Sequence, residues 1–128
     1  MGHTTAGGVR FLTDTVTYGV ASEMLVQLTH RDVFLGYFNS DGRQRVIERL
    51  YSGMRLGIED NELFVRSRDG RSVHVARFSK AFAERLAKWA AAGYWPTEIV
   101  IRHILWWKGE EDEQETLIVL PTIKLRRA

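Results

Sequence analysis

The chain has 128 residues, of which 45% are hydrophobic and 27% charged, with two prolines and no cysteine. This length and composition are typical of one folded domain with its own hydrophobic core, and they exclude a disordered or fibrous chain. The lack of cysteine excludes disulfides, thiolate catalysis and thiolate zinc sites, and the formal net charge is only +2.

Charged residues are unevenly distributed along the chain. Arginine supplies 14 of the 18 basic residues, and its planar guanidinium suits phosphate contacts and base stacking, although a GC-rich genome or a hot habitat would produce the same bias. Five acidic residues lie together in Glu110–Glu115, and the rest of the chain holds 18 basic against 11 acidic residues, a balance of +7. This segregation favours a polyanionic partner.

Membrane and export signals are absent from the sequence as given. No apolar run is long enough to span a bilayer, and the N-terminus lacks the basic region and apolar core of a secretory signal. We therefore expect a cytoplasmic protein without a membrane partner. The small, polar, glycine-rich residues 1–8 are expected to form a flexible tail before a single domain of residues 9–128.

The N-terminal half is predicted to contain a short strand and two helices. Alternation over Val9–Thr17 indicates the strand, and apolar residues at helical spacing indicate a helix over Ser22–Thr29. The apolar run Val33–Phe38 fits either the end of a buried helix or a short strand. A turn at Asn39–Gly42 then precedes an arginine-rich helix that extends to Met54.

A hairpin over residues 62–78 has the clearest local signal in the sequence. Two strand-like runs are joined by Asp69 and Gly70, and an Asp-Gly pair fits a two-residue type I′ turn. Such a turn fixes the register and places Phe64 opposite Val75. The sequence therefore predicts two antiparallel strands here.

The C-terminal half is predicted to contain one helix and a second hairpin. Ser79 caps a helix over Lys80–Ala92, and a long strand ending at Lys108 pairs with a final strand over Glu115–Leu125. Because Pro121 has no N–H to donate, the final strand is expected at a sheet edge. The element order predicts an α+β domain in which about four antiparallel strands, in two hairpins, are packed on one face by about three helices.

The strand that ends at Lys108 alternates aromatic, basic and apolar residues. With a side-chain period of two, Arg102, Trp106 and Lys108 share one face, while Ile101 and Trp107 share the other. The first face offers a flat ring beside cations, as base stacking and phosphate contact require. A sandwich core or a dimer contact is the alternative role for Trp106.

No catalytic constellation is present in the sequence. No histidine pair has the spacing of a helical zinc site, and no glycine pattern matches a phosphate loop. His74 and His103 lie among apolar neighbours, where a structural role is the usual one. The carboxylates of Glu110–Glu113 lack the spacing of a calcium loop. We expect neither an enzyme nor a bound cofactor or metal.

Several segments of the chain resemble the archaeal ThermoDBP proteins and their relatives: Phe34–Phe38 with the arginine-rich helix after it, Ser79–Phe82, Gly93–Pro96 and Trp106–Trp107. The resemblance runs from about Val9 to Leu125. It implies a thermophilic, archaeal single-stranded DNA-binding protein without an OB-fold, which uses a cleft of aromatic and apolar side chains flanked by basic ones. Some members continue into a C-terminal leucine zipper, and this chain has no heptads there.

The sequence thus predicts sequence-tolerant binding of single-stranded DNA, in preference to RNA, by a single nucleic-acid-binding domain. Stacked aromatic side chains and flanking cations would supply the contacts. An RNA-binding regulator and a protein-interaction or homodimerisation module are the alternatives. The predicted contact residues are Tyr37, Phe38, Phe64, Arg66, Arg68, Arg77, Arg102, Trp106 and Lys108.

Overall fold

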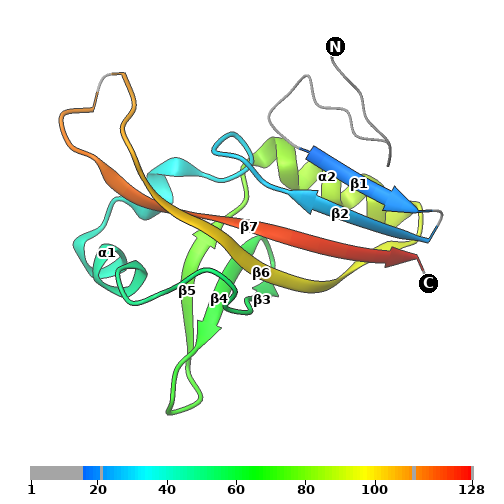
Figure 1. The fold of residues 1–128 in the computed structure, drawn as a ribbon, viewed down its shortest axis with the longest axis horizontal. Coiled ribbons are helices and arrows are strands. Elements are labelled where there is room, and N and C mark those ends of the chain that lie inside the picture. Colours follow the sequence, from blue (N-terminus) through cyan, green and yellow to red (C-terminus); the bar gives the residue numbers. More distant parts are fainter. Residues whose placement is uncertain (1–15, 21, 111, 128) are drawn as a thin grey trace.

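Seven strands, two α-helices and one 3-10 helix make up the described part of the chain, residues 16–20, 22–110 and 112–127 of a computed structural model (Figure 1). The tail predicted for residues 1–8 and most of the strand predicted for 9–17 lie outside the described residues. The elements in chain order are β1 (Val16–Val20), β2 (Glu23–Gln27), η1 (Leu35–Phe38), α1 (Asp41–Ile47), β3 (Gly57–Glu59), β4 (Glu62–Arg66), β5 (Ser72–Arg77), α2 (Lys80–Ala91), β6 (Tyr94–Trp107) and β7 (Thr116–Arg127).

The strands form two antiparallel sheets, in the orders β1-β2-β7-β6 and β3-β4-β5. The α+β class with antiparallel pairing is therefore confirmed. The finer prediction, about four strands packed by about three helices, is matched only roughly, because the structure has two sheets and two α-helices. Among the described residues, no helix is both long and apolar enough to cross a membrane.

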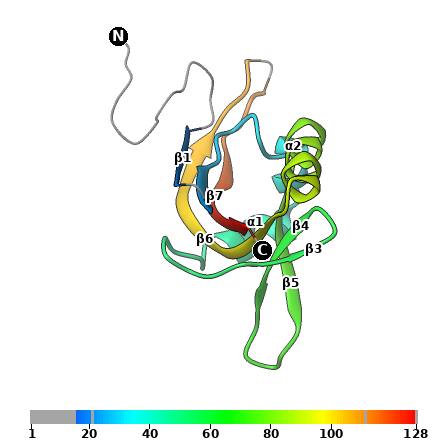
Figure 2. The ribbon, with the colours of Figure 1, turned by 90° about the vertical axis from the view of Figure 1, so that its right-hand side faces the viewer.

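Two isolated antiparallel bridges link segments of the two sheets. Val33, beyond the end of β2, bridges Phe78 after β5, and Arg55, before β3, bridges Val100 in β6. Figure 2 shows the β3-β4-β5 sheet below the long strands, with α2 beside them. Fully buried side chains from both sheets and from α2, including Ile123 and Phe82, belong to one apolar cluster. The core therefore lies between the sheets and α2.

The helix predicted over Ser22–Thr29 is wrong, because this segment contains strand β2. Met24 pairs with Leu125 and Val26 with Ile123 in the antiparallel ladder with β7. Apolar residues at helical spacing also fit a half-buried strand, and the partner strand that decides between the two lies about a hundred residues later in the sequence. This strand replaces one of the three predicted helices.

Strand β7 is central, which corrects the prediction that Pro121 places it at an edge. It pairs with β2 on one side and β6 on the other. The register of β6 shifts between Ile101 and His103, opposite Pro121, so the ladder is interrupted where the proline has no N–H. The Pro121 carbonyl still accepts a hydrogen bond from Leu28 N, at 3.0 Å.

The same irregularity changes which β6 side chains share a face. Ile101 is opposite Pro121, whereas Trp106 is opposite Leu117 and Trp107 opposite Thr116. Directly opposite residues share a face, so Trp106 lies on the face of Ile101 and Trp107 on the other. The predicted face that pairs Ile101 with Trp107 is therefore wrong, because one extra residue in a strand reverses the alternation beyond it.

The hairpin of β4 and β5 is confirmed, but its register between Phe64 and the turn differs from the prediction. Gly70 N donates to Ser67 O at 3.0 Å and Gly70 has φ of +85°, while Asp69 has no positive φ. This is a three-residue loop rather than a type I′ turn, which needs positive φ at both central residues. Phe64 consequently pairs with His74, not with Val75.

Both helices begin at serine caps, one in the predicted turn at Asn39–Gly42 and the other at Ser79, as predicted. Ser40 Oγ accepts from Arg43 N and Ser79 Oγ accepts from Phe82 N, each at 3.2 Å. Helix α2 matches its prediction closely, whereas α1 ends at Ile47 rather than near Met54. The chain beyond α1 instead joins the free edge of β6, where Gly53 N donates to Ile101 O at 2.7 Å.

Candidate nucleic-acid interface

The structure distributes the predicted contact residues over several regions instead of one sheet face. Arg66 and Arg68 lie at the tip of the β4–β5 hairpin, whereas Trp106 and Lys108 lie near the tip of the β6–β7 hairpin. Figure 1 shows these two tips projecting from different sides of the molecule. The predicted single platform is therefore not formed.

Phe38 is part of the core and Tyr37 is engaged within the protein. Phe38 is 0% exposed, so its predicted base contact is wrong. The guanidinium carbon of Arg43 lies 3.8 Å from the centre of the Tyr37 ring, and the Tyr37 hydroxyl donates to Glu62 Oε1 at 2.5 Å. Burial, followed by that hydrogen bond, raises the pKa of Tyr37 to about 12. One ring face and the hydroxyl of Tyr37 are thus already occupied.

Phe64 covers the backbone of β3. Its ring is half-buried and lies so close to Gly57 that a Cβ there would be 2.3 Å from Phe64 Cζ. The His74 ring meets it edge-on at 5.8 Å between centroids, and the Arg66 guanidinium is 5.6 Å from its centre. The Phe64 ring therefore serves packing within the β3-β4-β5 sheet.

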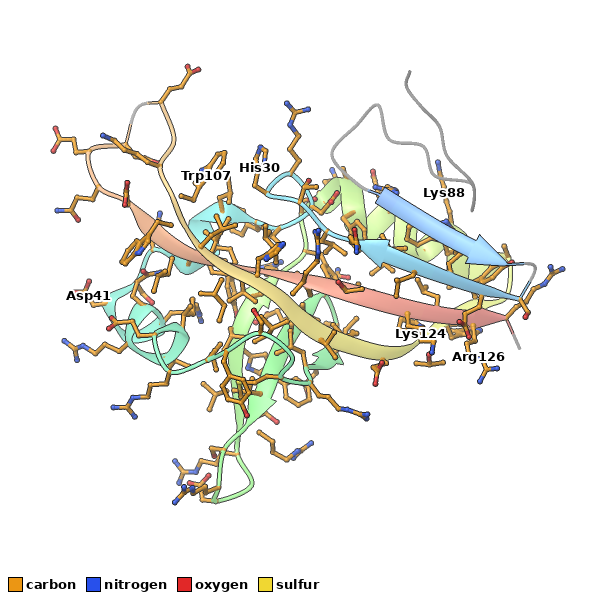
Figure 3. All side chains as sticks on the ribbon, in the orientation of Figure 1. His30, Asp41, Lys88, Trp107, Lys124 and Arg126 are labelled. Carbon is orange, nitrogen blue, oxygen red and sulfur yellow. The ribbon has the colours of Figure 1, made fainter. Side chains whose placement is uncertain are left out.

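The two adjacent tryptophans of β6 have different surroundings. Trp106 is 59% exposed, as a stacking residue must be. Trp107 is half-buried and stacks on His30, with 4.3 Å between ring centroids and 22° between ring planes. Figure 3 shows His30 and Trp107 side by side at one end of the long hairpin. Arg102 lies at the register shift of β6 and is half-buried. Its backbone carbonyl accepts a hydrogen bond from Ser52 Oγ at 2.9 Å.

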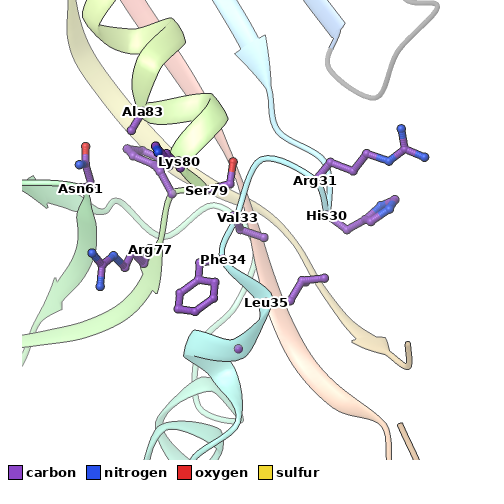
Figure 4. A pocket seen from close by; sticks show the side chains of 12 residues that line it. His30, Arg31, Val33, Phe34, Leu35, Asn61, Arg77, Ser79, Lys80 and Ala83 are labelled. Carbon is purple, nitrogen blue, oxygen red and sulfur yellow. The ribbon is translucent and has the colours of Figure 1, made fainter. Parts of the chain in front are cut away.

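A groove of about 740 Å³ lies between residues 30–36 and the start of α2 (Figure 4). The bridge between Val33 and Phe78 brings these two segments together, and Phe34 N donates to Arg77 O at 2.8 Å. Val33 and Phe78 are buried, while the neighbouring Phe34 is 50% exposed. The groove is lined by His30, Arg31, Val33, Phe34, Leu35, Gly36, Asn61, Arg77, Phe78, Ser79, Lys80 and Ala83.

The charge lining this groove is positive. Arg31, Arg77 and Lys80 contribute cations, and the residues lining it include no aspartate or glutamate. Asp32 is adjacent in sequence but buried, and its Oδ2 accepts from Thr29 N at 2.8 Å. The first turn of α2 also carries no acidic residue. The groove therefore combines an accessible aromatic ring with an electropositive wall, as a nucleic-acid site requires.

Of the predicted contact residues, only Arg77 lines this groove. Sequence reasoning missed Phe34, His30, Arg31 and Lys80, because the two walls come from segments more than forty residues apart. Periodicity leaves the apolar run that contains Phe34 undecided between core and cleft. The structure divides this run, with Phe34 in the groove and Phe38 in the core.

Within the described part of the chain, no three histidine, aspartate or glutamate side chains form a cluster that could hold a metal. No family model, curated protein or solved structure matches the chain. The resemblance to the ThermoDBP family and the expectation of a fold other than the OB-fold therefore stay predictions. The groove itself is the feature from which a function can be inferred.

Proposed function

We propose that the groove between residues 30–36 and α2 binds single-stranded nucleic acid with little sequence preference, DNA in preference to RNA. The observation that carries the proposal is the half-exposed ring of Phe34 in a groove whose lining includes Arg31, Arg77 and Lys80 and no carboxylate. Every base has a flat π-face, so a single aromatic platform serves any sequence. Such sites need no cofactor.

Each lining group has a chemical task in this proposal. A base stacks on Phe34, while Arg77 and Lys80 on the opposite wall contact phosphates. Arginine forks two hydrogen bonds to a phosphate, and lysine acts as a compact point charge. His30 lines the groove and stacks on Trp107, so a ligand that contacts His30 lies near an indole. Oligonucleotide binding should therefore quench tryptophan fluorescence.

The preference for DNA over RNA rests on the ThermoDBP resemblance alone. A protein distinguishes the two through contacts to the ribose 2′-hydroxyl. Competition between oligouridine and oligothymidine for the same site measures the preference directly. Stronger competition by oligouridine would make the protein an RNA binder that uses the same groove.

The test is titration of labelled oligothymidine at several salt concentrations. Phe34→Ala should weaken binding by about 1–3 kcal/mol, the usual loss for one stacked base. The double variant Arg77→Ala/Lys80→Ala should lower the slope of log affinity against log salt by about 1.4, since each phosphate contact on a single strand contributes about 0.7. The charge-matched control is Arg45→Ala/Arg49→Ala, which does not touch the lining of the groove and should leave the slope nearly unchanged.

Three results would contradict the groove proposal. Undetectable binding, or an affinity indifferent to salt, would remove nucleic acid as the ligand. A larger loss from Trp106→Ala than from Phe34→Ala would move the site to the predicted platform on β6. A molecular mass twice that of one chain, together with unquenched tryptophan fluorescence, would favour the dimerisation module.

A further inference from the structure

A second groove, of about 340 Å³, adjoins the first along α2. The two grooves share Asn61 and Ala83 as lining residues, so they lie next to each other. The remaining residues that line the second groove are Ile58, Asp60, Leu86, Ala87, Ala90, Trp95 and Pro96.

Both grooves follow the same walls. One wall is a face of α2, where Lys80, Ala83, Ala87 and Ala90 are three or four residues apart and lie one above the other. The other wall includes Asn61, which lies between β3 and β4 and lines both grooves. A strand of nucleic acid that contacts Phe34 and follows α2 would therefore reach the second groove next.

Trp95 is an exposed aromatic residue at the far end of this path. It is 55% exposed although it lies within β6. Its partner in the ladder with β7 is Arg126, which lies on the same face of the sheet. Arg126 forms an ion pair with Glu23, with 3.5 Å between Nε and Oε2. Figure 3 shows Arg126 and Lys124 near that end of β7. The second groove thus offers an accessible aromatic ring, as Phe34 does in the first.

We propose that one single strand of nucleic acid occupies both grooves and that Trp95 stacks a second base of that strand. This inference rests on the proposed function of the first groove. Arg31, Arg77 and Lys80 line the first groove, and this positive charge favours a polyanion over an apolar peptide as the ligand that continues into the second. Asp60 lines the second groove, so bases rather than phosphates face that wall.

The experiment compares binding of oligothymidines of graded length, from three nucleotides upward, by the wild type and by Trp95→Ala. The wild-type affinity should rise with length until both grooves are filled. Trp95→Ala should match the wild type on the shortest oligonucleotide that binds, and should fall about 5- to 100-fold below it on the longest. Trp95→Phe keeps a ring and should restore most of that loss.

Tyr51→Ala is the matched control, since Tyr51 is 63% exposed and lines neither groove. It should follow the wild-type length dependence. Thermal denaturation of each variant checks that the exposed Trp95 ring contributes little to folding.

Identical length profiles for wild type and Trp95→Ala, with Phe34→Ala still defective, would overturn the second contact and leave the first groove as the site. Absence of binding at every length would overturn both proposals together. An equal loss at all lengths would show that Trp95 belongs to the first binding step and would overturn the extended path.

Discussion

The side-chain amide of Gln44 pairs with the backbone of Leu117 through two hydrogen bonds of 2.9 Å. Gln44 Nε2 donates to Leu117 O, and Leu117 N donates to Gln44 Oε1. The ladder between β2 and β7 extends only to Thr122, so the amide supplies the bonds that a longer neighbouring strand would make. A third bond, from Nε2 to Phe38 O at 2.7 Å, attaches η1 to the same point.

Replacing Gln44 by leucine should therefore destabilise the fold. The substitution leaves the N–H and carbonyl of Leu117 without these partners, which costs about 1–3 kcal/mol for a desolvated group. Urea denaturation should show a lower midpoint with an unchanged slope. The neighbouring exposed residue offers the control, Arg45→Ala, which should stay within about 0.5 kcal/mol of the wild type. Equal midpoints for Gln44→Leu and wild type would show that water replaces the amide without loss.

Ionisation of Tyr37 should lower the stability of the fold at alkaline pH. Its pKa is raised from 10.0 to about 12, first by burial and then by the hydrogen bond to Glu62, so folding favours the protonated phenol. The resulting stabilisation is complete below pH 10 and is lost as the pH rises through 12. The unfolding free energy of the wild type should fall more steeply over this interval than that of Tyr37→Phe. Parallel pH profiles for the two proteins would refute the linkage.

Replacement of Gly57 and of Gly42 by alanine should change the stability of the fold in opposite directions. At Gly57 an added Cβ would lie 2.3 Å from Phe64 Cζ, whereas at Gly42 it would meet nothing within 4 Å. Gly57→Ala should destabilise by about 1–3 kcal/mol through overpacking, and Gly42→Ala, within α1, should stabilise by up to about 1 kcal/mol. Thermal denaturation should show a lower melting temperature for Gly57→Ala and a higher one for Gly42→Ala. Adding Phe64→Leu to Gly57→Ala should recover part of the loss, and no recovery would mean that the ring is not the obstacle.

A feature of this fold can be predicted from the sequence when the residues that determine it lie close together in the chain. Ser40 and Ser79 cap helices through residues three positions away, so both helix starts can be predicted. The same holds for the existence of the β4–β5 hairpin. The residues of β2 fit a helix equally well, and only the distant β7 makes them a strand. Pro121 lies in a central strand because a register shift in β6 lies opposite it, and no local pattern indicates that shift.

The candidate site shows the same limit. Arg77 could be selected from the sequence, as one of the basic residues of a hairpin with a clear local signal. Phe34 and Lys80 could not be linked to it, because the bridge between Val33 and Phe78 that assembles the groove joins positions 45 residues apart. Composition predicts a basic, aromatic surface, and tertiary contacts decide which of the aromatic rings remain accessible.

Substitutions at Phe34 should affect binding and substitutions at Phe38 should affect stability, although the two residues lie only four positions apart. Phe38 is fully buried and Phe34 is half-exposed in the groove. Phe38→Ala should cost about 3–5 kcal/mol of unfolding free energy, as for other large core side chains, and Phe38→Leu a smaller part of that if the alanine variant does not fold. Phe34→Ala should change stability by about 1 kcal/mol or less. Urea denaturation and oligothymidine titration on the same samples distinguish the two roles. We expect Phe34→Ala to fold normally and bind weakly, and Phe38→Leu to bind normally while it remains folded. A large stability loss from Phe34→Ala with unchanged affinity would mean that its ring packs the groove wall and stacks no base.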